Sequence, residues 1–219
     1  MSAYFHDRTE AGQLLGRELR KYAGRADVLV LALPRGGVPV GFQVANELKA
    51  RLDVFLVRKL GVPGHEELAM GAIASGGVRV LNEDVIRRIP ISHEIIERVA
   101  AKEQLELRRR ELAYRDDTSP IDISGKVVIL VDDGIATGST MCAAIAALKK
   151  YHPARIVVAA PTAPKSCQKE IGPEVNEIVI VVKPDPFYSV GQAYALFDQT
   201  SDEEVRAILA RSKQWLEKR

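Results

Sequence analysis

Short runs of apolar, β-branched residues recur along the chain and predict its strands. Such runs occupy residues 27–33, 52–57, 127–131 and 155–160, with a fifth at 177–182. Strands that are apolar along their whole length are buried on both faces, which is typical of a parallel sheet covered by helices. The pattern therefore predicts an α/β fold with a Rossmann-like parallel sheet.

The segments between these runs have helical spacing. Residues 38–50 and 139–151 each follow a glycine-containing turn that comes directly after a strand. Residues 7–22, before the first strand, predict an amphipathic helix that ends at Gly24. Repeated strand–helix–strand units place ligand sites at the carboxyl ends of the strands.

The connection between the second and third strands is unusually long. It contains a charged stretch, residues 92–117, that predicts an exposed helix because its acidic and basic residues alternate. Long excursions of this kind are often lids or binding loops. We expect one domain over residues 1–219, with a helical lid insertion near 60–120 and a hood segment near 183–219.

Charge and cysteine content narrow the class of protein. The 219-residue chain has 31 Lys and Arg against 29 Asp and Glu, a net charge of +2, whereas nucleic-acid binding usually needs a broad basic surface. Cys142 and Cys167 lack the spacing of a metal site or a disulfide framework. No apolar signal segment or membrane-spanning run is present. We expect a cytoplasmic protein without nucleic-acid or membrane partners.

The most informative segment is residues 128–140, VILVDDGIATGST. A buried strand is followed by Asp132 and Asp133, and then by a small, hydroxyl-bearing loop that leads into a helix. Backbone N–H groups and hydroxyls in such a loop form a phosphate cradle. The carboxylates would repel a phosphate but would accept hydrogen bonds from neutral hydroxyls, as on a ribose whose 5-phosphate sits in the loop. The acidic pair alone can be a helix cap, and the hydroxyl-bearing loop alone can be a turn. The two together, in this order, favour a ligand site.

Residues 128–140 resemble the phosphoribosyl pyrophosphate (PRPP) signature of the type I phosphoribosyltransferases. The motifs FHDR at 5–8, LPRGGV at 33–38 and PFYSVG at 186–191 resemble, more specifically, a bacterial branch of that family whose substrate is unsettled. The resemblance implies that Asp132 and Asp133 hold the ribose hydroxyls. It also implies that the 5-phosphate lies against Ala136, Thr137, Gly138, Ser139 and Thr140.

Two further loops carry cations or glycines suited to an anion. After the first strand, Arg35, Gly36 and Gly37 offer a guanidinium and backbone amides, and they resemble the family's pyrophosphate loop. After the second strand, Arg58 and Lys59 precede a glycine-bearing excursion, as a lid closing over an anion requires. A solvated strand end is the alternative interpretation of these two cations.

The implied reaction is displacement at the anomeric carbon of PRPP, with Mg²⁺ bridging pyrophosphate and ribose oxygens. Asp132, Asp133 and Arg35 are expected to act through positioning and electrostatics. Hypoxanthine-type relatives carry a carboxylate where this chain has Ala136. Glu66, with Glu67 beside it, is therefore the candidate for another acid/base group. The sequence does not assign protein ligands for the metal.

The acceptor is expected to be a small nitrogenous molecule. Phe187 and Tyr188 are candidates to stack on it, although an aromatic pair can equally belong to the core. Residues 160–164, APTAP, lack the lysine with which purine-salvage relatives read an oxo group. We therefore expect hypoxanthine and guanine to be poor substrates.

Two other classes of protein fit part of the pattern. One is a non-catalytic regulator that senses PRPP, which the balanced charge disfavours. The other is a phosphatase or mutase of another α/β fold that uses the acidic pair on Mg²⁺. Oligomeric state is left open, with a homodimer among the expected assemblies.

Overall fold

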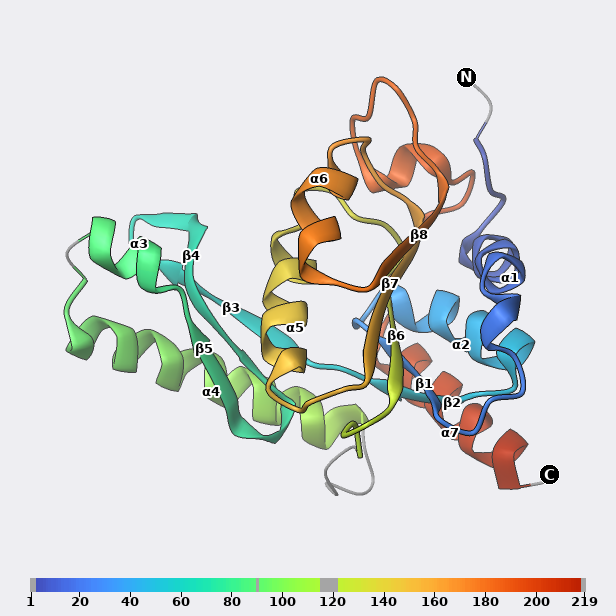
Figure 1. The fold of residues 1–219 in the computed structure, drawn as a ribbon, viewed down its shortest axis with the longest axis horizontal. Helices are drawn as coiled ribbons and strands as arrows, with labels where there is room; N and C mark the ends of the chain where they lie inside the picture. The colour runs from blue at the N-terminus through green and yellow to red at the C-terminus, as the bar shows by residue number, and fades with distance from the viewer. Residues whose placement is uncertain (1–2, 90, 115–121, 218–219) are drawn as a thin grey trace. The chain divides into compact units, whose positions relative to one another are not determined.

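The computed structural model describes residues 3–89, 91–114 and 122–217, and the chain forms two compact units (Figure 1). The first unit comprises Met1–Val54, Ile121–Gly138 and Pro153–Arg219. The second comprises Phe55–Pro120 and Ser139–His152.

A five-stranded parallel sheet forms the centre of the first unit. Its order is β2 (Arg51–Val54), β1 (Val28–Ala32), β6 (Val127–Val131), β7 (Arg155–Thr162) and β8 (Glu177–Val182). Every residue of β1 and β6 is buried, as their uninterrupted apolar sequences predict. The predicted α/β fold and the five predicted strands are confirmed.

The register of β1 against β6 determines which loops meet at the edge of the sheet. The two strands end on the same pair, because Ala32 lies opposite Val131. The Leu33 N–H still donates to the Val131 carbonyl, at 2.8 Å. The segments after the two strands therefore leave the sheet side by side.

Helices cover both faces of this sheet, with α1 and α2 on one face and α6 on the other in Figure 1. Their bounds are α1 (Arg8–Glu18), α2 (Gly37–Leu48) and α6 (Cys167–Ile171), with short 3₁₀ turns at Arg20–Tyr22, Gly172–Glu174 and Val190–Ala193. The side chain of Asp7 caps α1 by accepting from the Glu10 N–H, at 2.9 Å. α1 and α2 pack closely because Gly12 and Gly16 face α2 without a Cβ atom.

The C-terminal helix α7 (Asp202–Glu217) was not predicted as a helix. It packs on α2 and β2, and its buried residues are Val205, Ile208, Leu209 and Ser212. These positions follow the 3.6-residue period of an amphipathic helix. The expected hood near 183–219 thus ends in a helix that packs against the sheet unit.

The second unit contains an antiparallel sheet of β3 (Val57–Val62), β4 (His65–Ala74) and β5 (Val78–Leu81), with a 3₁₀ turn at Ser75–Gly77. The helices α3 (Glu83–Arg88), α4 (His93–Tyr114) and α5 (Ser139–Lys149) pack on it. The first part of the insertion expected to be helical is therefore β-structure. The helix predicted at 92–117 is α4, and residues 115–117 lie outside the described residues.

One aromatic contact and two hydrogen bonds link different segments of the second unit. Phe55 packs edge-on against Tyr151, with ring centroids 6.2 Å apart. The Tyr151 hydroxyl donates to the Ser75 carbonyl, and the Ser75 hydroxyl accepts from the Leu56 N–H at 3.3 Å.

Within the described part of the chain, no helix is both long and apolar enough to cross a bilayer.

Candidate functional site

Two adjacent carboxylates stand at the carboxyl end of β6, as the sequence predicts. Asp132 and Asp133 are both partly buried, and Asp132 Oδ1 accepts from the Asp133 N–H at 2.9 Å. Burial, followed by the charge of Asp133, raises the pKa of Asp132 well above its usual range. Such a site gains from a ligand that donates hydrogen bonds to the carboxylates.

Arg8, the first residue of α1, is the counter-ion of Asp133. Its Nε donates to Asp133 Oδ2 at 2.8 Å, and the two side chains are only 13% and 15% exposed. Burial raises the pKa of Asp133, while the charge and hydrogen bond of Arg8 act in the opposite direction. The positive charge of Arg8 therefore compensates one of the two negative charges of the acidic pair.

An aromatic cluster from the N- and C-terminal segments surrounds this ion pair. The guanidinium carbon of Arg8 lies 4.0 Å from the ring centroid of Phe197, which itself stacks on Tyr194 at 4.8 Å. The Tyr194 hydroxyl donates to the Asp133 carbonyl at 2.5 Å, and burial raises the pKa of that hydroxyl. Phe5 completes the cluster, 5.5 Å from Tyr194.

The glycine loop after β1 lies directly against the acidic pair. A Cβ atom on Gly36 would lie 1.9 Å from Asp133 Oδ2, and one on Gly37 would lie 2.8 Å from the Val131 carbonyl oxygen. Only glycine allows this approach. The predicted pyrophosphate loop and the predicted ribose carboxylates are thus neighbours.

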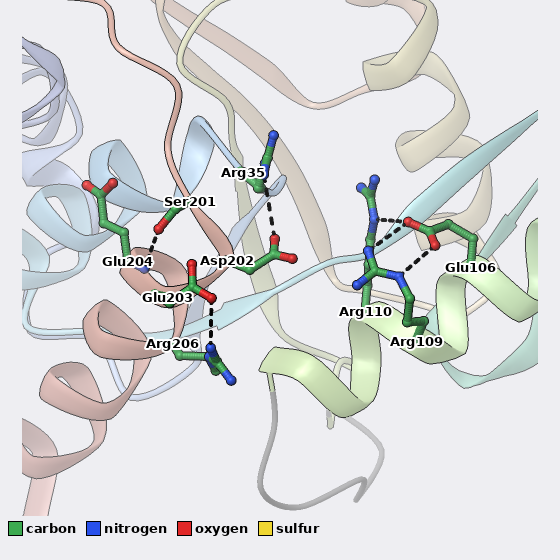
Figure 2. A network of polar contacts seen from close by, with 9 residues as sticks. All are labelled: Arg35, Glu106, Arg109, Arg110, Ser201, Asp202, Glu203, Glu204 and Arg206. Atoms are coloured by element: carbon green, nitrogen blue, oxygen red, sulfur yellow. Dashed lines mark hydrogen bonds and ion pairs between the residues drawn. The ribbon is translucent and has the colours of Figure 1, made fainter.

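Arg35 precedes these glycines and reaches toward the start of α7 (Figure 2). Its Nη1 lies 3.8 Å from Asp202 Oδ1, and the side chain is 33% exposed. A long, partly solvated ion pair of this kind is weak. Beside it the Ser201 hydroxyl accepts from the Glu204 N–H at 3.1 Å, which caps α7.

The loop after the acidic pair is anchored at its base and exposed at its tip. Gly134 packs against Val190, whose Cγ1 would lie 2.3 Å from a Cβ at position 134. The Ile135 N–H donates to the Thr162 carbonyl at 2.9 Å. Ala136 and Thr137 are exposed, and Gly138 has a φ of +73°. The predicted phosphate residues Ser139 and Thr140 follow as the first residues of α5, in the second unit.

Three predicted site residues, Arg58, Lys59 and Glu66, belong to the second unit. Arg58 is paired with Glu103, whose Oε2 lies 2.5 Å from Nη2. Glu66 is exposed and accepts from the Gly64 N–H at 3.1 Å. Backbone N–H groups lower the pKa of Glu66, whereas a general base near neutral pH needs a raised pKa.

A second ion-pair cluster in this unit lies on α4 (Figure 2). Glu106 accepts from Arg109 at 2.8 Å and from Arg110 at 2.8 Å. These hydrogen bonds lower the pKa of Glu106 to about 2. The i,i+3 and i,i+4 spacing is that of an exposed helix, as the alternating charge predicts.

The predicted acceptor residues lie on the loop after β8. Tyr188 is 77% exposed and Phe187 is half-buried. The Tyr188 N–H donates to Gln192 Oε1 at 2.8 Å, and Gln192 Nε2 donates to the Pro186 carbonyl at 3.3 Å. This short loop presents the Tyr188 ring to solvent rather than to the core.

Sequence reasoning missed Arg8, Tyr194 and Phe197 as members of the site. Arg8 is 125 residues from Asp133 in the chain, and Tyr194 is 61 residues from it. No local spacing reports contacts at such separations. The one available signal was the FHDR motif at residues 5–8, which had no assigned role.

The acidic pair and the glycine loop lie within a stretch, residues 8–188, that matches the family model of the phosphoribosyl transferase domain. The chain belongs to this family. Its resemblance to the phosphoribosyltransferases is thereby confirmed, and the parallel sheet, the glycine loop and the acidic pair can be described as parts of a phosphoribosyl transferase domain.

Similar proteins span different lengths. Two Mycobacterium tuberculosis proteins named "Putative phosphoribosyl transferase", MT0597 from strain CDC 1551 / Oshkosh and Rv0571c from strain ATCC 25618 / H37Rv, are each 44% identical over 208 residues, covering 95% of this chain and 47% of theirs. The phosphoribosyl transferase chain thus spans about half the length of these curated relatives. The crystal structure of TT1426 from Thermus thermophilus is 40% identical with a TM-score of 0.87, covering 94% of this chain and 98% of that one.

Proposed function

We propose that the chain binds PRPP together with Mg²⁺ and transfers phosphoribose to a nitrogenous acceptor, with release of pyrophosphate. One observation carries the proposal. Gly36 lies so close to Asp133 that a Cβ atom on Gly36 would be 1.9 Å from Asp133 Oδ2. It brings a loop suited to pyrophosphate beside carboxylates suited to ribose hydroxyls. Family membership supports the same chemistry.

Each part of PRPP then has a complementary partner. The ribose hydroxyls donate to Asp132 and Asp133, and the 5-phosphate takes the loop of residues 136–140, whose tip is exposed. The pyrophosphate binds Arg35 and the amides of Gly36 and Gly37. Since the Arg35–Asp202 contact is long, at 3.8 Å, a phosphate oxygen can replace it at little cost.

The reaction exchanges one bond for another at the anomeric carbon. A nitrogen of the acceptor forms a bond to that carbon while the carbon–oxygen bond to pyrophosphate breaks, and the proton of the acceptor passes to a base or to solvent. Mg²⁺ bound together with the substrate would offset the negative charge of the departing pyrophosphate. The protein contributes position and electrostatics.

The insertion and the C-terminal loop are proposed to complete the site. Arg58 and Lys59 would act from a lid over the anion, with Arg58 exchanging Glu103 for a phosphate. Phe187 and Tyr188 would stack on the acceptor, and Glu66 is the candidate base despite its lowered pKa. The composition supports a cytoplasmic location.

Pyrophosphate release tests the transfer reaction. The protein is assayed with PRPP and Mg²⁺ alone, and then with adenine, hypoxanthine, guanine or uracil added. We expect hypoxanthine and guanine to be turned over poorly, because residue 136 is alanine rather than a carboxylate and residues 160–164 contain no lysine to read an oxo group. An unpaired buried group can cost several orders of magnitude in kcat/KM.

Efficient turnover of hypoxanthine or guanine would contradict this specificity. Acceptor-dependent release with another base would support the transferase and name its substrate class. Tight binding of PRPP without release, whatever the acceptor, would favour the sensing regulator over the enzyme.

A further inference from the structure

The FHDR motif has no role in the proposed function, yet its last residue reaches the acidic pair. Arg8 lies at the start of α1, and its guanidinium contacts the carboxylate of Asp133 at 2.8 Å. Contacts across 125 positions of the chain are made only by the folded unit. Arg8 is therefore part of the candidate site.

Three contacts hold the Arg8 side chain in one place. Besides the ion pair with Asp133, its Nη1 donates to the Asp198 carbonyl at 2.7 Å, and its guanidinium stacks 4.0 Å over Phe197. Only 13% of the side chain is exposed. A cation fixed in this way is preorganised, so little rotamer entropy remains to be lost when a ligand binds beside it.

The charge of Arg8 offsets the electrostatic repulsion between the two adjacent carboxylates. Asp132 and Asp133 are both partly buried, so their mutual repulsion favours protonation of one of them. A protonated carboxyl group donates a hydrogen bond and loses acceptor capacity. Arg8 compensates one charge, so that both groups can accept from the two hydroxyls of a ribose.

The geometry also distinguishes the two oxygens of Asp133. Arg8 binds Oδ2, which is the oxygen nearer to Gly36. A Cβ atom on Gly36 would lie 1.9 Å from Oδ2 and 3.1 Å from Oδ1. The Tyr194 hydroxyl holds the carbonyl of the same residue at 2.5 Å. With Oδ2 engaged and the backbone fixed, the direction of Oδ1 is determined.

We propose, resting on the proposed function, that Arg8 is a positioning residue for PRPP: its ion pair with Oδ2 of Asp133 orients Oδ1 to accept a ribose hydroxyl. Arg8 itself does not contact the pyrophosphate group. It acts only on the ribose half of the ligand, and this separates its role from that of Arg35.

Calorimetry with three ligands, each with Mg²⁺, tests this role: PRPP, ribose 5-phosphate and inorganic pyrophosphate. In Arg8→Gln, affinity for the two ribose ligands should fall about tenfold or more, whereas affinity for pyrophosphate should stay within about twofold. Arg8→Lys, which keeps the charge but loses the fork and the stack, should be intermediate. Arg25→Gln is the matched control, because Arg25 also pairs with an aspartate, Asp27, at 2.7 Å.

Coupling between the two residues completes the experiment. In an Asp133→Asn background, Arg8→Gln should cause no further loss of affinity, since its partner carboxylate is gone. Equal losses for pyrophosphate and the ribose ligands, or additive losses in the double variant, would overturn the role of Arg8. If Arg8→Gln does not fold, the comparison of Arg8→Lys with wild type across the three ligands decides the question. Failure of the wild type to bind PRPP would instead overturn the proposed function.

Discussion

The burial of Asp132 opposes the stability of the fold. Burial and the charge of Asp133 raise its pKa in the folded protein. A carboxyl group with a raised folded-state pKa contributes stability that is present at low pH and lost as pH rises through that pKa. Above that pKa, the ionised Asp132 therefore favours the unfolded chain, in which it is hydrated.

We expect Asp132→Asn to raise the melting temperature at pH values above the raised pKa of Asp132, because it removes a poorly solvated charge while its Oδ1 can still accept from the Asp133 N–H. The gain should shrink as pH falls through the raised pKa of Asp132, and thermal melts between about pH 5 and about pH 8 measure it. Asp27→Asn is the control, since Arg25 lowers the pKa of Asp27 and that substitution should not stabilise. A melting temperature below wild type throughout this range would contradict the buried-charge explanation.

Close packing of α1 on α2 sets the position of Arg8, the first residue of α1. A Cβ atom on Gly12 would lie 2.8 Å from the Val40 carbonyl oxygen and 2.8 Å from Gln43 Cβ. The first of these is a backbone atom, so the overlap is relieved only by moving a helix.

Gly12→Ala should therefore destabilise the protein, even though alanine is the better helix former by roughly 1 kcal/mol. Overpacking typically costs about 1–3 kcal/mol, and separation of the helices adds lost contacts, so a net loss of about 1 kcal/mol is expected. Urea unfolding measures it, with Gln13→Ala on the exposed face of α1 as the control. An unchanged or higher midpoint for Gly12→Ala would show that the two helices are not held at this distance.

Sequence and structure agree best where local pattern decides the element. Uninterrupted apolar runs predicted β1 and β6, and register then brought Arg35, Asp132 and their glycine neighbours together. The strands β3 to β5 were missed because the insertion offers charged and small residues, such as His65 to Ala74 in β4, with no clear alternation. α7 was also missed, although its apolar residues Val205, Ile208 and Leu209 recur at helical spacing.

Each of the two units is assembled from segments far apart in the sequence. The first unit joins three stretches of chain, and its acidic pair receives Arg8 from the first and Tyr194 from the last. Local patterns predicted the acidic pair, but its counter-ion and its aromatic support depend on tertiary contacts. The sequence therefore predicts the acidic pair and the glycine loop of the candidate site, and the fold adds Arg8, Tyr194 and Phe197.

The acidic pair at the end of β6 is proposed to bind the ribose of PRPP. Calorimetric titration of PRPP into wild type, Asp132→Asn and Asp133→Asn, with and without Mg²⁺, tests it most directly, with Asp27→Asn as the control. We expect Mg²⁺-dependent binding that weakens in both site variants by roughly 1.5–3 kcal/mol, the value of a hydrogen bond to a charged group, and that is unchanged in the control. Equal affinity in wild type and in both site variants would show that the acidic pair does not bind the ribose.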